Sequence, residues 1–150
     1  MIIVEINDEA ITRALTQAVT ALGDLTPLME GIGEILVAST KARFGEGVAP
    51  DGSHWASNSP VTLARKKDSR PLFGLTGMLN SQIAVEAGNG FVDVSSNRVY
   101  AAMMQFGGTK AQFPHLWGDI PARPFLGFSD QDKQDILDEI TEALERAMRA

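Results

Sequence analysis

Residues 100–129, YAAMMQFGGTKAQFPHLWGDIPARPFLGFS, are the stretch around which the rest of the chain is arranged. The stretch opens with a short apolar segment that ends at Gly107-Gly108, where glycine reaches positive φ without a Cβ clash. We therefore predict one or two buried helical turns over residues 100–106. The stretch contains three of the seven prolines and no cluster of His, Cys and carboxylates typical of a reaction centre. It favours contacts over chemistry.

The next part, the loop over residues 107–119, carries two large aromatic side chains between glycines. Phe113 and Trp117 suit either the core or a partner interface. Platforms that stack single-stranded nucleic acid lie in basic grooves, and only Lys110 and Arg123 are basic in this stretch. The sequence therefore disfavours nucleic-acid stacking and predicts a loop that is either mobile or docked.

The last part, residues 120–127, has the sequence IPARPFLG, and we call it the strap. Its two prolines, three positions apart, bias the residues before them toward extended geometry. Arg123 can then project to one side while Phe125 and Leu126 anchor the other. Arg123 either satisfies carbonyls of its own chain or contacts a second subunit.

The N-terminal part predicts a strand followed by a helix. Residues 1–6 alternate between apolar and polar side chains, the pattern of a short half-buried strand. Asn7 or Asp8 caps the helix and Gly23 ends it. Its apolar face has the i, i+3, i+4 spacing of a core-facing helix: Ile11, Ala14, Leu15, Ala18, Val19 and Leu22.

A second helix begins at the Thr26-Pro27 pair, with the threonine as cap, and extends to Phe44-Gly45. Gly31 and Gly33 lie inside it, and each costs about 1 kcal/mol relative to alanine. We expect that another backbone approaches the helix at these glycines.

The middle of the chain predicts a loop over residues 45–59 with a turn at Pro50-Asp51-Gly52. We expect Trp55 to pin this loop to the body of the protein. Short helices are predicted over residues 59–67 and at Thr76.

Two further elements complete the prediction. Residues 82–87 and 91–95 flank the turn residues 88–90 and predict a β-hairpin. The last helix begins at Ser129, with Asp132 forming an approximate capping box. The fold class is therefore α+β: a small antiparallel sheet, in which the N-terminal strand joins the hairpin, covered by three amphipathic helices in one domain over residues 1–150.

Composition excludes several function classes. The chain has no cysteine, so neither a disulfide nor a thiolate metal site can form. A net charge of −6 weakens the case for sequence-independent nucleic-acid binding. No apolar run approaches the length of a membrane span, and the first residues lack a signal-peptide pattern. We expect a soluble, unsecreted protein.

Charge is unevenly placed along the sequence. Residues 41–70 carry six basic and three acidic side chains, whereas residues 129–150 carry three basic and seven acidic ones. Either these are two ordinary solvated faces, or the positive side of one protomer meets the negative side of a neighbour.

Candidate catalytic groups are sparse. His54 and His115 each lie near a carboxylate, Asp51 and Asp119, and a metal or acid–base site would need both loops to meet. The sequence GGTK at residues 107–110 resembles the end of a phosphate-binding loop. The first glycine of that motif and the strand before it are missing. We predict no enzyme activity, no cofactor and no metal.

Several short motifs, taken in their order along the chain, resemble a known family. They are Phe44-Gly45, Pro50-Asp51-Gly52, Trp55, Thr76-Gly77-Met78-Leu79, Tyr100-Ala101, Gln105-Phe106-Gly107 and the strap. This order resembles the phage virion morphogenesis family, the tail-completion proteins of Mu-like phages and prophages. Met104 stands where that family often has a histidine.

The resemblance implies a structural protein that completes or caps the head-proximal end of the tail and prepares head–tail joining. It also implies partners with axial symmetry, namely tail-tube and head–tail connector proteins. Together with the complementary charged segments and the aromatic side chains of Phe113 and Trp117, this leads us to predict a closed ring of identical subunits, six where the tail has sixfold symmetry. Membrane and specific nucleic acid are not expected partners. The host cytoplasm during assembly, and then the virion, are the expected locations.

For the contact surface we predict Lys110, Phe113, Trp117, Arg123 and Phe125. Aromatic and arginine side chains of this kind are enriched at interface centres. The alternative function is a small metal-dependent hydrolase or nuclease that uses His54 and His115.

Overall fold

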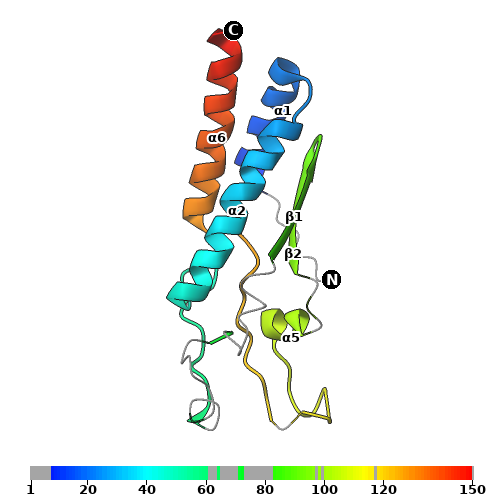
Figure 1. The fold of residues 1–150 in the computed structure, drawn as a ribbon, viewed down its shortest axis with the longest axis vertical. Coiled ribbons are helices and arrows are strands. Elements are labelled where there is room, and N and C mark those ends of the chain that lie inside the picture. Colours follow the sequence, from blue (N-terminus) through cyan, green and yellow to red (C-terminus); the bar gives the residue numbers. More distant parts are fainter. Residues whose placement is uncertain are drawn as a thin grey trace.

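The computed structural model describes residues 8–60, 64, 71–72, 83–96, 98, 100–116 and 118–149. Its elements are α1 (Glu9–Leu22), α2 (Thr26–Glu46), β1 (Ile83–Gly88), β2 (Phe91–Ser96), α5 (Ala101–Phe106) and α6 (Asp130–Arg149). These helices and the antiparallel hairpin confirm the predicted α+β class. The molecule is elongated: α1, α2 and α6 lie side by side with the hairpin against them, and α5 and the long loops form the opposite end (Figure 1).

Helix α1 begins and ends where the sequence predicts. The Asp8 carboxylate accepts a hydrogen bond from the Ile11 N–H at 3.0 Å, and Gly23 has a φ of 72°. Asp8 also pairs with Lys133 of α6 at 2.9 Å, so this cap ties the start of α1 to α6. The strand predicted over residues 1–6 lies outside the described residues.

The start of α2 differs from the prediction. Leu25 occupies the cap position without a side-chain bond, and Thr26 is the first helical residue. The Asp24 carboxylate accepts hydrogen bonds from the Thr26 N–H at 3.0 Å and from its hydroxyl at 2.7 Å, and these bonds lower the pKa of Asp24. The helix extends past the predicted end to Glu46, where left-handed Gly47 stops it.

Side chains of other elements, and not another backbone, lie against the two glycines inside α2, so the predicted backbone approach is wrong. A Cβ on Gly31 would lie 2.8 Å from Oε1 of Glu139 on α6. A Cβ on Gly33 would lie 2.7 Å from Cγ2 of Val85 and 3.1 Å from Cγ2 of Val92. Gly31 therefore makes room for α6, and Gly33 for the hairpin.

The hairpin is confirmed, with Val85 opposite Val94 in the antiparallel register. Its turn is Asn89-Gly90, and Gly90 has a φ of 101°. The Asn89 side-chain oxygen accepts a hydrogen bond from the Leu25 N–H at 2.8 Å, which fixes the hairpin tip to the turn between α1 and α2. Within the described residues the sheet has these two strands only.

Helix α6 begins with the predicted capping box. The Ser129 N–H donates to Asp132 Oδ2 at 2.9 Å, and the Asp132 N–H donates to Ser129 Oγ at 3.0 Å. The short helices predicted over residues 59–67 and at Thr76 lie almost wholly outside the described residues. No helix in the described ranges has the length and apolar character needed to cross a membrane.

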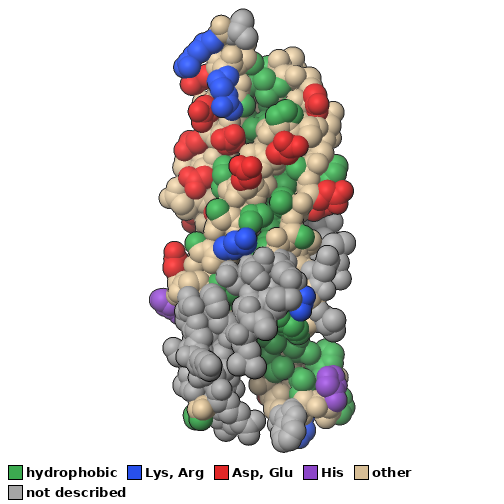
Figure 2. Space-filling view, in the orientation of Figure 1, with side chains coloured by type: hydrophobic (Ala, Val, Ile, Leu, Met, Phe, Trp, Pro, Cys, Tyr) green, Lys and Arg blue, Asp and Glu red, His purple; other side chains and the backbone are tan. Residues whose placement is uncertain are grey.

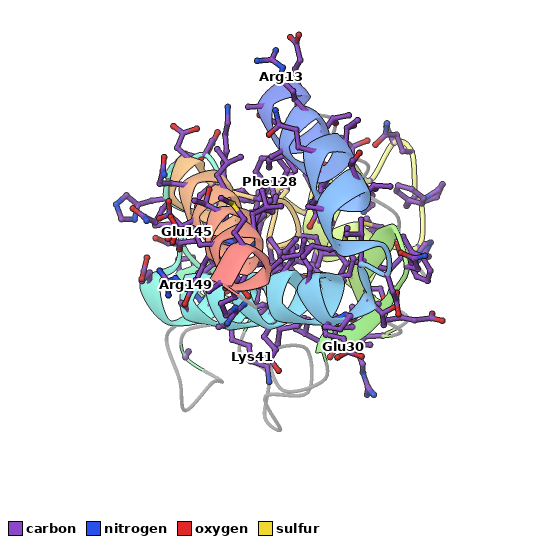
Figure 3. The ribbon with its side chains drawn as sticks, turned by 90° about the horizontal axis from the view of Figure 1, so that it is seen from above. Arg13, Glu30, Lys41, Phe128, Glu145 and Arg149 are labelled. Carbon is purple, nitrogen blue, oxygen red and sulfur yellow. The ribbon has the colours of Figure 1, made fainter. Side chains whose placement is uncertain are left out.

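Two apolar clusters form the interior. The first lies among α1, α2 and α6, and it borders a cavity of about 200 Å³. Phe128, between α6 and α1, lines this cavity, while labelled charged side chains such as Arg13 and Glu30 point outward (Figure 3). The second cluster lies toward the α5 end and contains Phe44, Ala49, Trp55, Ala101, Phe125 and Leu126.

Candidate interaction surface

The strap is held by buried side chains from separate parts of the chain. Gln105 of α5 accepts hydrogen bonds from the N–H groups of Phe125 and Leu126, both at 3.0 Å, and its side-chain nitrogen donates to the Leu126 carbonyl at 3.1 Å. One buried amide therefore satisfies three backbone groups that would otherwise lack partners.

Arg43 of α2 holds the same end of the strap from another side. Its Nε donates to the Phe125 carbonyl at 3.2 Å and its Nη2 to the Gly127 carbonyl at 2.9 Å. Its Nη1 pairs with Asp132 at 3.1 Å, and both side chains are at most 5% exposed. A single guanidinium thus joins α2, the strap and α6.

Trp55 and Arg123 fasten the neighbouring loop to the strap. The Trp55 indole N–H donates to the Pro124 carbonyl at 2.8 Å, which confirms that Trp55 pins its loop. Arg123 Nε donates to the Ala56 carbonyl at 2.8 Å and Nη2 to the Ser57 carbonyl at 3.0 Å. Burial lowers the pKa of the Arg123 guanidinium from its usual value. Arg123 therefore satisfies carbonyls of its own chain.

The segment after α5, residues 108–120, is organised by its own hydrogen bonds, and we call it the finger. An antiparallel bridge closes its base. The Thr109 N–H donates to Gln112 Oε1 and the Gln112 N–H donates to Thr109 Oγ1, both at 3.1 Å. The Lys110 N–H donates to Asp119 Oδ1 at 2.8 Å. These bonds join the two ends of the finger and fix the turn at Thr109 to Gln112.

Helix α5 and the finger expose an apolar patch. Phe106 is 61% exposed and Phe113 is 38% exposed. Met103 and Phe113 both lie against Gly108, where an added Cβ would be 2.7 Å from the Met103 sulfur and 2.9 Å from the Phe113 ring. Hydrophobic side chains gather at this end of the molecule in Figure 2. We define the terminal patch as Met103, Phe106, Phe113, Ile120 and Pro121, the last two bordering a hollow beside Phe106.

The five residues predicted for the contact surface occupy different environments. Lys110 and Phe113 lie exposed on the finger. Phe125 is fully buried and Arg123 is 8% exposed, so in this chain they anchor the strap and offer little surface. Trp117 lies outside the described residues. A role for these residues in subunit contact stays a prediction.

The two histidines lie on separate loops, and the imidazole groups appear on opposite edges of the molecule in Figure 2. The carboxylates near His54 and His115 have other partners. Asp51 accepts hydrogen bonds from Ser53, which lower its pKa, and Asp119 binds the finger backbone. The described ranges contain no group of three or more His, Cys, Asp and Glu residues that could hold a metal ion.

Comparison with known proteins decides the family. The model of the phage virion morphogenesis family matches residues 6–145. The chain belongs to the phage virion morphogenesis family. This family is one of structural phage morphogenesis proteins.

Two relatives of this virion morphogenesis protein come from Mu-like genomes. Protein G of Escherichia phage Mu, whose name assigns it to capsid assembly, is 29% identical, with 97% of each chain covered. The Mu-like prophage FluMu G protein 2 of Haemophilus influenzae is 33% identical over 93% of this chain and 94% of its own. No solved structure matches the chain.

The sequence alone assigns no structural role to two residues that fix this region of the virion morphogenesis protein: Arg43, and Gln105, which is named only within a motif of the resemblance. Each is a polar residue on the apolar face of its helix. Arg43 lies seven positions after Leu36, and Gln105 lies four positions after Ala101, spacings that place each pair on one face. A polar side chain at a core-facing position of a helix is a signal for a buried hydrogen-bond network.

Proposed function

We propose that this chain completes or caps the head-proximal end of the phage tail and prepares it for joining to the head. It acts as a closed ring of identical subunits, six where the tail has sixfold symmetry, against tail-tube and head–tail connector proteins. It works without catalysis, cofactor, membrane or specific nucleic acid. It assembles in the host cytoplasm and stays at the head–tail junction of the virion.

The observation that carries this proposal is the terminal patch. Helix α5 buries Ala101 and Gln105 against the strap, yet its opposite side exposes Phe106. A helix that is apolar on both sides is expected to be covered on both sides. A contiguous exposed apolar patch with aromatic side chains is typical of a protein–protein contact. An assembly protein would bury this patch in the virion.

The strap supports the same proposal because it makes the patch rigid. Gln105 and Arg43 fix the strap behind α5, and the finger is closed by its own bonds. A contact surface that is ordered before binding loses less conformational entropy on association. The hydrolase alternative has no comparable support, because His54 and His115 lie on separate loops whose carboxylates are already engaged.

The test is complementation of a prophage that lacks this gene, with electron microscopy of the induced lysate. We expect the deletion to leave filled heads and tails unjoined, and the wild-type chain to restore complete particles. Phe106→Ser with Phe113→Ser should fail to restore them while the purified protein melts like its parent. Met148→Ser is the matched control, since Met148 is 83% exposed at the end of α6.

A different lysate would contradict the proposal. If the deletion abolishes heads and leaves normal tails with complete ends, the chain acts in capsid assembly, the process that names the phage Mu relative. If Phe106→Ser with Phe113→Ser restores particles as well as the wild-type chain, the terminal patch is not the contact surface.

A further inference from the structure

The outward face of the hairpin carries two carboxylates directly opposite each other. Glu86 of β1 pairs in register with Asp93 of β2, whereas the Val85 and Val94 pair faces α2. Like charges placed directly across a sheet destabilise it. Within the described part of the chain, neither carboxylate has a hydrogen bond or an ion pair. A cation from outside the chain would relieve their repulsion.

An aromatic ring lies on the same outward face. Phe91 lies two positions before Asp93 on β2, so the two side chains share one face of the hairpin. Phe91 pairs with Gly88, and its ring occupies the space that a Cβ on Gly88 would need. The side chain is 46% exposed. Contact with the Gly88 backbone restricts the ring, so it loses little rotamer freedom on burial. The hairpin thus presents an ordered aromatic anchor beside two unneutralised acids.

The opposite end of the molecule has the complementary features. A hollow of about 360 Å³ is lined by the apolar side chains of Phe106, Ile120 and Pro121 and by the polar finger residues Thr109, Gln112 and Asp119. The Asp119 carboxylate is already engaged by the Lys110 N–H. The Lys110 side chain is exposed and has no ion pair among the described residues. The hollow has room for one apolar side chain, and the exposed Lys110 is the sequence neighbour of its lining residue Thr109.

We propose that the hairpin of one copy docks on the finger end of the next copy. Phe91 enters the hollow at Phe106, and Lys110 lies between Glu86 and Asp93. This inference rests on the proposed ring of identical subunits and names both halves of its contact. We choose a second copy as the partner because one chain carries both complementary surfaces. The hairpin carries Phe91 and the two acids, and the finger end carries the hollow and Lys110; the hairpin and the finger end lie apart along the molecule (Figure 1).

The contact is heterologous, since different surfaces of the two copies meet. Such contacts close into a ring when the rotation between neighbours permits, and otherwise continue as an open filament. Complementary charge across the contact sets its register and speeds association.

Charge exchange tests the pairing. Lys110→Glu and the double variant Glu86→Lys with Asp93→Lys should each weaken self-association by about tenfold or more, because like charges then face each other. A chain that carries all three substitutions should regain association. Sedimentation velocity over a range of concentration and salt measures this, and circular dichroism melting checks that every variant is folded. Lys41→Glu, at an exposed position on α2, is the matched control and should associate like the wild-type chain.

Two results would overturn the inference. One is a wild-type chain that stays monomeric at every concentration, and the other is a triple variant that associates no better than Lys110→Glu. Either result can coexist with full complementation of the deleted prophage, in which case the role in tail completion stands and the hairpin contact between copies in solution fails. Failure of the wild-type chain to join heads to tails would instead refute the function.

Discussion

Arg43 Nη1 lies 3.1 Å from Asp132 Oδ2, although the two residues are 89 positions apart in the sequence. The guanidinium also donates to Ser39 and Thr40 on its own helix and to the carbonyls of Phe125 and Gly127. Its hydrogen-bonding capacity is therefore used inside the protein. Asp132 has a second task as the capping side chain of α6, so one carboxylate fixes both the helix start and the arginine.

Asp132→Ala should lower the free energy of unfolding by about 3–5 kcal/mol, the usual cost of leaving one partner of a buried ion pair uncompensated. Urea unfolding followed by circular dichroism measures the loss. Asp130→Ala removes an exposed carboxylate from the same helical turn and should change stability by less than about 0.5 kcal/mol. Equal losses in the two variants would show that the pair with Arg43 contributes nothing.

The two glycines of α2 should respond in opposite directions to alanine. At Gly31 the new methyl group meets the end of the flexible Glu139 side chain, which can move, so the variant gains up to about 1 kcal/mol from helix propensity. At Gly33 it meets Cγ2 atoms of Val85 and Val92, whose β-branched side chains have few alternative rotamers. Gly33→Ala should therefore lose about 1–2 kcal/mol through overpacking. Thermal melts of both variants against the parent check the signs, and a stabilised Gly33→Ala would mean that the hairpin is not tightly seated.

The elements that sequence reasoning predicted well are those whose signals are local. The Asp8 cap, the Asn89-Gly90 turn and the Ser129–Asp132 box each depend on residues within a few positions of one another. The network around the strap could not be read in this way, because Arg43 and Gln105 find their partners across 20 to 89 positions.

The predicted contact residues show the same limit. Sequence alone left Arg123 and Phe125 open between anchoring the strap and contacting a partner. In extended geometry either direction is available to a side chain, and only packing against Phe44, Trp55 and the neighbouring loop decides between them. Phe106, in contrast, is exposed because α5 carries apolar side chains on more than one side, and only the side with Ala101 and Gln105 is buried.

Asp8 should make stability depend on pH in the acid range. The Ile11 N–H, and then Lys133, lower the pKa of this carboxylate below its value of 3.8 in the unfolded chain. A group with a lowered pKa in the folded state stabilises the fold above its unfolded pKa, and this contribution is lost as pH falls through the folded pKa. Asp8→Asn keeps a good cap but loses the Lys133 pair. The stability difference between parent and variant should be constant near neutral pH and shrink below about pH 4. A difference that stays the same down to pH 2, measured by urea unfolding, would contradict the assignment.

Arg123→Glu should unfold the chain at a markedly lower temperature than the parent, although a residue that only served subunit contact would leave the monomer intact. In the folded chain the guanidinium donates to the carbonyls of Ala56 and Ser57, and a carboxylate there would place negative charge against two acceptors. Loss of these bonds and burial of an unpaired charge should cost about 3 kcal/mol or more. Arg123→Lys keeps the charge but cannot donate from two separate nitrogens, so its melting temperature should lie between those of the parent and Arg123→Glu. Lys110→Glu should melt like the parent, since Lys110 is exposed on the finger. Differential scanning calorimetry of the three variants separates the roles: a parent-like melt for Arg123→Glu would mean that Arg123 is free to contact a neighbouring subunit.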